Sequence, residues 1–84
     1  MTVPDKEQEV ATQEKRLTTE WTQITDGTQD ATIQVLGGVI YLRDSPTKPL
    51  DTEKGHVIDD WVSVSPPQQA WVRSTWGITN IVVT

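Results

Sequence analysis

Short segments of alternating apolar and polar residues constrain the fold of this chain more than any other feature. From Trp21 onward such segments recur, separated by residues that favour turns. The clearest lies at 31–35, where Ala31, Ile33 and Val35 alternate with polar residues. Because successive side chains of a strand point to opposite faces, this period of two predicts strands with one buried face.

The turn signals divide the chain after Trp21 into separate strands. A strand at 21–25 is followed by Asp26-Gly27, which predicts a hairpin, and Gly37-Gly38 leads into an apolar strand at 39–43 that we expect to be central in its sheet. Further strands are expected at 56–58, 61–65, 70–76 and 78–83, the last two forming a hairpin around Gly77. The spacing predicts an all-β fold, a small antiparallel β-sandwich or barrel of about six or seven short strands.

Residues 1–20 have a different composition, because every glycine, every tryptophan and the single tyrosine follow Glu20. Helix-tolerant residues predict a helical or extended N-terminal arm, and its apolar residues fall seven positions apart, at Val3, Val10 and Leu17. A helix this short is marginal alone in water. The segment is therefore either a solvated, frayed arm or an arm that becomes ordered against a partner subunit. We expect two parts, an arm at 1–20 and a β-module at 21–84.

Length and charge limit the classes of function. The 84 residues allow one domain with a thin core, and without cysteine there is neither a disulfide nor a thiolate metal site, which favours oligomerisation or docking. A net charge of -5 argues against binding to nucleic acid. No apolar run approaches the roughly 20 residues that span a bilayer. The first residues also lack the features of a signal peptide, so we expect no membrane insertion and no secretion by that route.

Few residues offer catalytic or metal-binding chemistry. His56 is the only histidine, and no G-x-S-x-G nucleophile motif accompanies it. Asp59 and Asp60 are adjacent, so on a strand they would point to opposite faces. The acidic turn at 26–30 lacks the spacing of a calcium loop. We therefore expect a protein that is not an enzyme and has no cofactor or metal, with a small hydrolase built on His56 as the last alternative.

Two strands place tryptophan on the face opposite their valines or alanine. Trp61 shares a face with Ser63, and Trp71 shares a face with Arg73. If the valines form the core, Trp61, Trp71 and Arg73 lie together on a second, half-polar face. That face would be either a protein interface or a platform on which tryptophan rings stack against sugars. The other possibility is that both tryptophans are buried and fill the core.

A set of short motifs extends this picture, in the order 28–35, 38–41, 44–49 (D-S-P-T-K-P), 55–58 (G-H-V-I) and 70–74 (A-W-V-R-S). Over 21–84 the set resembles small structural β-modules of tailed bacteriophages. The resemblance implies a virion component made in the host cytoplasm and placed on the particle exterior, such as a capsid decoration, head-fibre or tail-associated protein. It would dock on the major capsid protein or other virion proteins through its arm and form a homo-oligomer, most simply a trimer. The alternative is a carbohydrate-binding module that attaches the virion to a glycan of the host surface.

Overall fold

The computed structural model describes residues 12–84, and every regular element in this part of the chain is a strand. The strands are β1 (Gln13–Leu17), β2 (Thr22–Gln23), β3 (Ala31–Leu36), β4 (Ile40–Asp44), β5 (His56–Ile58), β6 (Trp61–Val64), β7 (Ala70–Ser74) and β8 (Thr79–Val83). They form two antiparallel sheets of four strands, sheet A in the order β1-β8-β3-β6 and sheet B in the order β2-β7-β4-β5. The all-β prediction is confirmed for residues 12–84, where the strands number eight, more than the six or seven expected.

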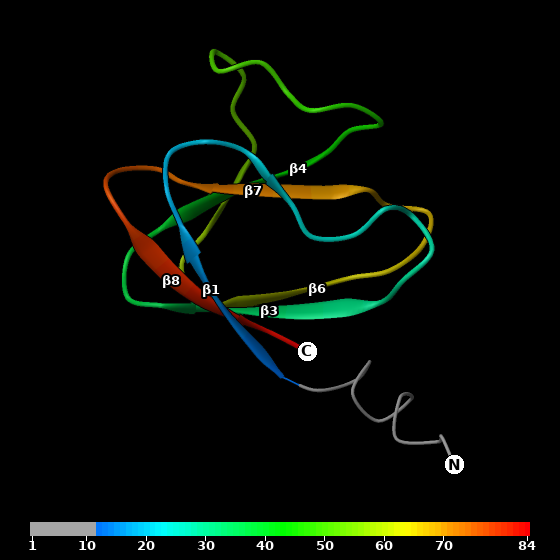
Figure 1. Cartoon of the computed structure of the whole chain (residues 1–84), viewed down its shortest axis with the longest axis horizontal. Helices are drawn as coiled ribbons and strands as arrows, with labels where there is room; N and C mark the ends of the chain where they lie inside the picture. The colour runs from blue at the N-terminus through cyan, green and yellow to red at the C-terminus, as the bar shows by residue number, and fades with distance from the viewer. Residues whose placement is uncertain (1–11) are drawn as a thin grey trace.

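The two sheets lie on either side of one hydrophobic core, as the layers of strands in Figure 1 show. The predicted alternation in β3 is confirmed, since its residues at 31, 33 and 35 are buried and those between them are exposed. The strand β4 is central, with β7 on one side and β5 on the other, as expected. The buried core is built from Leu17, Ala31, Ile33, Val35, Ile40, Leu42, Val64, Ala70, Val72 and Ile81.

The connections between strands cross from one sheet to the other almost everywhere. Only β4 and β5 are both consecutive in the chain and neighbours in a sheet. The hairpins predicted at Asp26-Gly27 and around Gly77 are therefore wrong, because β2 and β3, and likewise β7 and β8, belong to different sheets. The turn at Asp26 does form, with the backbone N–H and the hydroxyl of Thr28 donating to its carboxylate. Local turn chemistry bends the chain, but it does not decide which strand lies next to which.

The first strand corrects the predicted boundary between arm and module. Gln13–Leu17 forms β1, which pairs with β8 from Gln13↔Val83 to Leu17↔Thr79. Leu17 is fully buried in the core of its own sandwich, so it does not belong to a docking stripe. Pairing with a strand far away in the sequence overrides the helix tolerance of the charged residues in this segment. Val3 and Val10 lie outside the described residues.

A long connection covers the part of the outer face of sheet B that β4 and β7 form, while Val57 on the edge strand β5 stays 66% exposed. The β4–β5 loop, residues 45–55, lies on the far side of β4 and β7 from β3 and β6 (Figure 1). Its backbone carbonyls accept hydrogen bonds from side chains of the sheet. Two tryptophans donate through Nε1, Trp71 to Ser45 O (2.9 Å) and Trp21 to Leu50 O (3.1 Å). Two arginines donate through their guanidinium groups, Arg73 Nη2 to Glu53 O (2.8 Å) and Arg43 Nη1 to Lys54 O (2.7 Å).

Candidate binding surface

The outer face of sheet A carries no comparable cover from the described residues. Every second residue of its four strands points outward, and the strand register arranges these residues in rows. We call this set the sheet A face. Its rows are Thr12, Thr84, Thr32 and Ser63; then Glu14, Val82, Gln34 and Trp61; then Arg16, Asn80 and Leu36.

Trp61 is the largest side chain of the sheet A face. It begins β6 and is 62% exposed, whereas Val62 and Val64 of the same strand turn toward the core. Its backbone N–H donates to the carboxylate of Asp60, which ties the start of the strand to the preceding turn. The side chain of Trp61 therefore points to solvent, while the valines of the same strand pack against the core.

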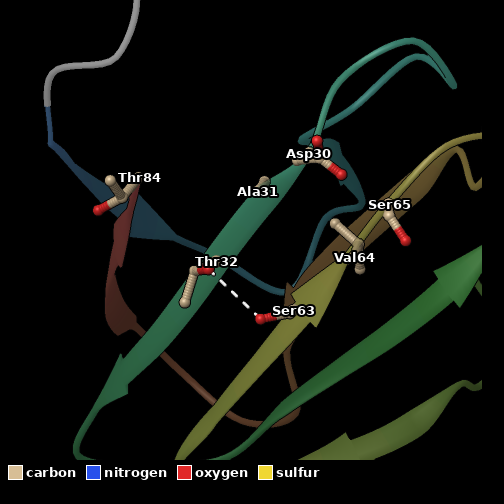
Figure 2. A pocket seen from close by; sticks show the side chains of 7 residues that line it. All are labelled: Asp30, Ala31, Thr32, Ser63, Val64, Ser65 and Thr84. Atoms are coloured by element: carbon tan, nitrogen blue, oxygen red, sulfur yellow. Dashed lines mark hydrogen bonds between the residues drawn. The ribbon is translucent and has the colours of Figure 1, made fainter.

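A row of hydroxyl groups lies next to Trp61. The hydroxyls of Thr32 and Ser63 are hydrogen bonded across β3 and β6 at 3.3 Å, and Thr84 continues the row on β8. Figure 2 shows Thr32 and Ser63 turned toward one another, with Asp30 near the end of the same strands. Together with Ala31, Val64 and Ser65 these residues line a shallow, open hollow of about 260 Å³. Its walls present hydroxyls and one carboxylate, which are groups that hydrogen bond without requiring a charged ligand.

The end of the sandwich formed by the β3–β4 and β7–β8 turns exposes further apolar side chains. Leu36 is 46% exposed at the end of β3, Ile78 is half exposed just before β8, and Trp76 is 86% exposed in the turn. The turn that carries Trp76 is fixed, since the buried hydroxyl of Ser74 bonds both the N–H and the carbonyl of residue 76. An ordered turn thus holds a tryptophan in solvent.

The structure separates the tryptophans that the sequence pattern placed on one face. Trp71 and Arg73 lie on the outer face of sheet B, in the other layer from Trp61, and both contact the β4–β5 loop. The guanidinium of Arg73 lies 4.7 Å from the centroid of the Trp21 ring and 5.5 Å from that of Tyr41. The prediction of one shared face is wrong, because β6 and β7 joined different sheets. Of the three predicted residues, Trp61 presents the most open surface.

Titratable residues do not converge on a catalytic site within residues 12–84. His56 is exposed at the start of β5, and no hydrogen bond between described residues involves its ring. No group of three or more metal-ligating side chains forms in this part of the chain, and no helix there is long and apolar enough to cross a membrane. The pKa of Asp26 is lowered by the hydrogen bonds from Thr28, and that of Glu20 by a hydrogen bond and the charge of Lys48, 2.6 Å away. Both shifts arise from local partners at the surface.

Sequence reasoning did not single out Leu36, Trp76 or Ile78. A signal for Leu36 was present, because the alternation of 31–35 continued by one residue places it on the solvent side. Trp76 precedes Gly77, whose φ of +64° marks the turn that carries the indole outward.

Comparison of the chain with family models, with curated proteins and with solved structures finds no match. The likeness of its short motifs to phage modules therefore stays a prediction, and function has to be inferred from the surface.

Proposed function

We propose that this chain is a non-enzymatic structural protein of a phage virion, most simply a capsid decoration or head-fibre protein that works by binding other protein surfaces. The observation that carries the proposal is the exposure of Trp61, Leu36, Ile78 and Trp76 on one small sandwich. Exposed large apolar side chains mark contact sites, and tryptophan is among the residues that contribute most to binding. The phage origin rests on the ordered motifs at 28–74.

In this proposal the segment before β1 docks the protein on the major capsid protein or another virion protein, with Val3 and Val10 as its apolar contacts. The net charge of -5 suits a position on the exterior, away from packaged DNA. Leu17 is excluded from this role because it is part of the core.

Deleting residues 1–11 tests the docking role while leaving β1 and its pairing with β8 intact. We expect incorporation into particles to fall by about tenfold or more, the change that corresponds to about 1.4 kcal/mol of lost binding free energy. The double variant Val3→Ser/Val10→Ser should show the same loss without shortening the chain. Unchanged incorporation of both variants would remove the docking role. Copy number per particle then separates a capsid decoration, with hundreds of copies, from a protein of the tail or of a vertex.

The hollow of Figure 2 favours a second candidate, a carbohydrate-binding module for attachment to the host surface. Ser63 lies two residues after Trp61 on the same face, roughly 7 Å along the strand. A sugar ring stacked on the indole would therefore present its hydroxyls to Ser63 and Thr32, and only a longer oligosaccharide would reach Asp30.

Fluorescence titration with neutral oligosaccharides checks this candidate. We expect quenching in the wild type, none in Trp61→Ala, and weaker binding in Thr32→Val, which removes one hydroxyl at nearly constant volume. Quenching that persists in Trp61→Ala would assign the signal to another tryptophan and exclude the sheet A face as the sugar site.

A further inference from the structure

We propose that copies of this chain join by exchanging β1, so that the β1 of one copy occupies the place beside β8 of another copy. The proposal goes beyond the function proposed above, because it concerns how copies of the chain join and holds whether or not they belong to a virion. Three observations carry it: an edge of β8 that fits β1, a strand held in the core by one apolar side chain, and a short connection behind that strand.

The edge of β8 that β1 covers is already shaped for this strand, and we call it the acceptor edge. Five residue pairs, from Gln13↔Val83 to Leu17↔Thr79, join the two strands, and β8 is the only neighbour of β1 among the described strands. Without β1, the acceptor edge would be an uncovered strand with no charged residue at 79–83, and such edges pair readily with another strand. The β1 of a second copy has the same sequence, so it makes the same five pairs.

One buried side chain holds β1 in the core. On the inner face of this strand Leu17 is 1% exposed, whereas Lys15 is half-buried and Gln13 is exposed. The neighbouring strands β3 and β8 each bury at least two residues. Detaching β1 therefore uncovers less of the core than detaching either of them would. The cavity that Leu17 leaves is filled by the same leucine of the incoming strand, so the exchanged form carries no lasting cost of an empty cavity.

The connection from β1 to sheet B is short and exposed. Leu17 and Trp21 are both buried, and the three residues between them, 18–20, are exposed and bend at 19–20. Packed sheets lie about 10 Å apart, and the four residue steps from 17 to 21 reach at most about 13–14 Å. The crossing therefore has little length to spare. Short connections of this kind favour exchange between copies, because opening the bend relieves the constraint.

Few contacts hold the bend closed. Glu20 pairs with Lys48 at 2.6 Å, but both side chains are largely exposed, and ion pairs of this kind contribute little. The carbonyl of Thr18 accepts a hydrogen bond from the N–H of Ser74. This bond is made again after exchange, since Thr18 moves together with β1. The exchanged segment thus ends at Thr18, and the hinge is 19–20.

Reciprocal exchange closes at two copies. When each copy gives its β1 to the other, both acceptor edges are covered and a twofold axis relates the two copies. The free edge of the exchanged strand carries three consecutive charged residues, 14–16, which discourage the addition of a further strand. The exchange therefore predicts a dimer, in place of the trimer expected from the sequence.

The tether of β1 to its own module sets the concentration at which exchange competes. A short linker gives an effective concentration in the millimolar range, so we expect monomers at about 5 µM and a substantial share of dimers near about 1 mM. A dimer that has formed separates only when both copies of β1 detach. We therefore expect it to persist after dilution for longer than a dimer held by surface contacts.

Disulfide cross-linking between copies tests the exchange directly, because the chain contains no cysteine. Glu14→Cys and Val82→Cys place thiols on opposed residues of β1 and β8. The two variants are mixed, refolded together at about 1 mM and oxidised, and peptide mapping identifies the disulfide that joins them. Gln34→Cys replaces Val82→Cys in the matched control. Gln34 pairs with Val82 in the same row but lies two strand spacings from Glu14, about 10 Å, whereas a disulfide needs Cα atoms within about 7 Å.

We expect at least about tenfold more cross-linked product from Glu14→Cys with Val82→Cys than from Glu14→Cys with Gln34→Cys. Equal yields from the two mixtures would overturn the proposal, because random collisions would then account for both.

The length of the hinge gives a second test. Deleting Thr19 leaves three residue steps, which reach only about 10–11 Å and so hardly span the two sheets. This variant should be a dimer at about 5 µM in sedimentation equilibrium, where the wild type is a monomer. Insertion of two glycines after Thr19 is the control and should stay monomeric at about 1 mM. A folded, monomeric deletion variant would contradict the exchange; if the deletion does not fold, the cross-linking of full-length chains decides alone.

The outcome is separable from that of the virion role. Cross-linking through β1 and β8 without incorporation into particles would reject only the virion role, whereas normal incorporation without cross-linking would reject only the exchange.

Discussion

The outer faces of the two sheets differ in what covers them. Sheet B presents Tyr41, Arg43, Trp71 and Arg73 at outward positions, and the β4–β5 loop of the same chain lies over them. Sheet A presents Trp61, Leu36 and Arg16 at equivalent positions, and these stay open to solvent. Both faces combine bulky apolar side chains with arginine. We infer that the alternation within a strand determines the direction in which a side chain points. Whether an outward-pointing side chain is buried depends on a loop from another part of the chain.

The covered face contributes to stability through a match of donors and acceptors. The indole and guanidinium N–H groups of sheet B meet backbone carbonyls of the loop at 2.7–3.1 Å. On sheet A the indole of Trp61 has no such partner among the described residues. We therefore expect substitutions on the sheet B face to lower the free energy of unfolding, and substitutions on the sheet A face to change binding instead.

The largest contrast is expected between two tryptophans. Trp21 is 3% exposed, stacks on Arg73 and bonds the loop, so Trp21→Ala should destabilise the domain by about 3–5 kcal/mol, as for other buried aromatic truncations. Trp61→Ala should change stability by no more than about 0.5 kcal/mol. Urea denaturation followed by circular dichroism measures both, and Trp21→Phe gives a milder variant if Trp21→Ala does not fold. Equal effects at the two sites would erase the distinction between the faces.

Gly55 tests how tightly the loop is held on the sheet. A Cβ atom at this position would lie 2.3 Å from the carbonyl oxygen of Leu42, which is closer than any real contact. Gly55→Ala should therefore push the loop away from β4 and destabilise the domain by about 1–3 kcal/mol, the usual range for overpacking. Lys54→Ala, one residue earlier and exposed, is the control. We expect the near-ultraviolet dichroism of the tryptophans to change in Gly55→Ala only; an unchanged spectrum would show that the loop tolerates the shift.

Substitution of Arg73 tests whether stability depends on a planar cation next to the rings of Trp21 and Tyr41. Arg73→Lys keeps the charge but loses the planar group between Trp21 and Tyr41 and the second donor, so we expect a loss of about 1–2 kcal/mol. Arg16→Lys on the sheet A face should leave stability within about 0.5 kcal/mol of the wild type. Thermal denaturation of both variants and the wild type under the same conditions measures these changes in stability. A larger effect at Arg16 would contradict the assignment of the two faces.

The smallest effect concerns the ion pair that ties the loop to the turn after β1. Lys48 lowers the pKa of Glu20 below its ordinary value of 4.5, so the ionised carboxylate is favoured in the folded chain. The stabilisation it gives is present above that value and is lost as the pH falls through the lowered pKa. Glu20→Gln should therefore differ from the wild type near neutral pH, and the difference should vanish in acid. Urea midpoints of both proteins between pH 7 and 3 test this; a constant difference would mean that the pair does not titrate.

Much of the fold was predictable because it follows from short-range pattern. The burial of Ile33 and Val35 and the split of β6 between Trp61 and its valines result from alternation, and the central place of β4 follows from its continuous apolar run. The partners of each strand were not predictable in this way. The turn at Asp26-Gly27 has the chemistry of a hairpin, yet the chain crosses to the other sheet there.

The candidate surface was predictable only in part, for the same reason. The pattern placed Trp61 either on an outward face opposite its valines or in the core, and its grouping with Trp71 required both strands to share a sheet. The strand β1 was missed because its residues 13–16 are polar and helix-tolerant, and only its pairing with β8 makes them a strand. Long-range pairing of this kind leaves no local signal in a single sequence.

The pairing of β1 with β8 also governs the order of events during synthesis. The strand β1 is among the first parts of the module to leave the ribosome, and its one neighbour in the sheet is the last strand to appear. Sheet A therefore cannot close before β8 has been made, and β1 stays without its partner strand until then. Its charges at 14–16 keep the waiting segment soluble and away from other nascent chains. The same charged edge thus protects the protein during translation as well as after folding.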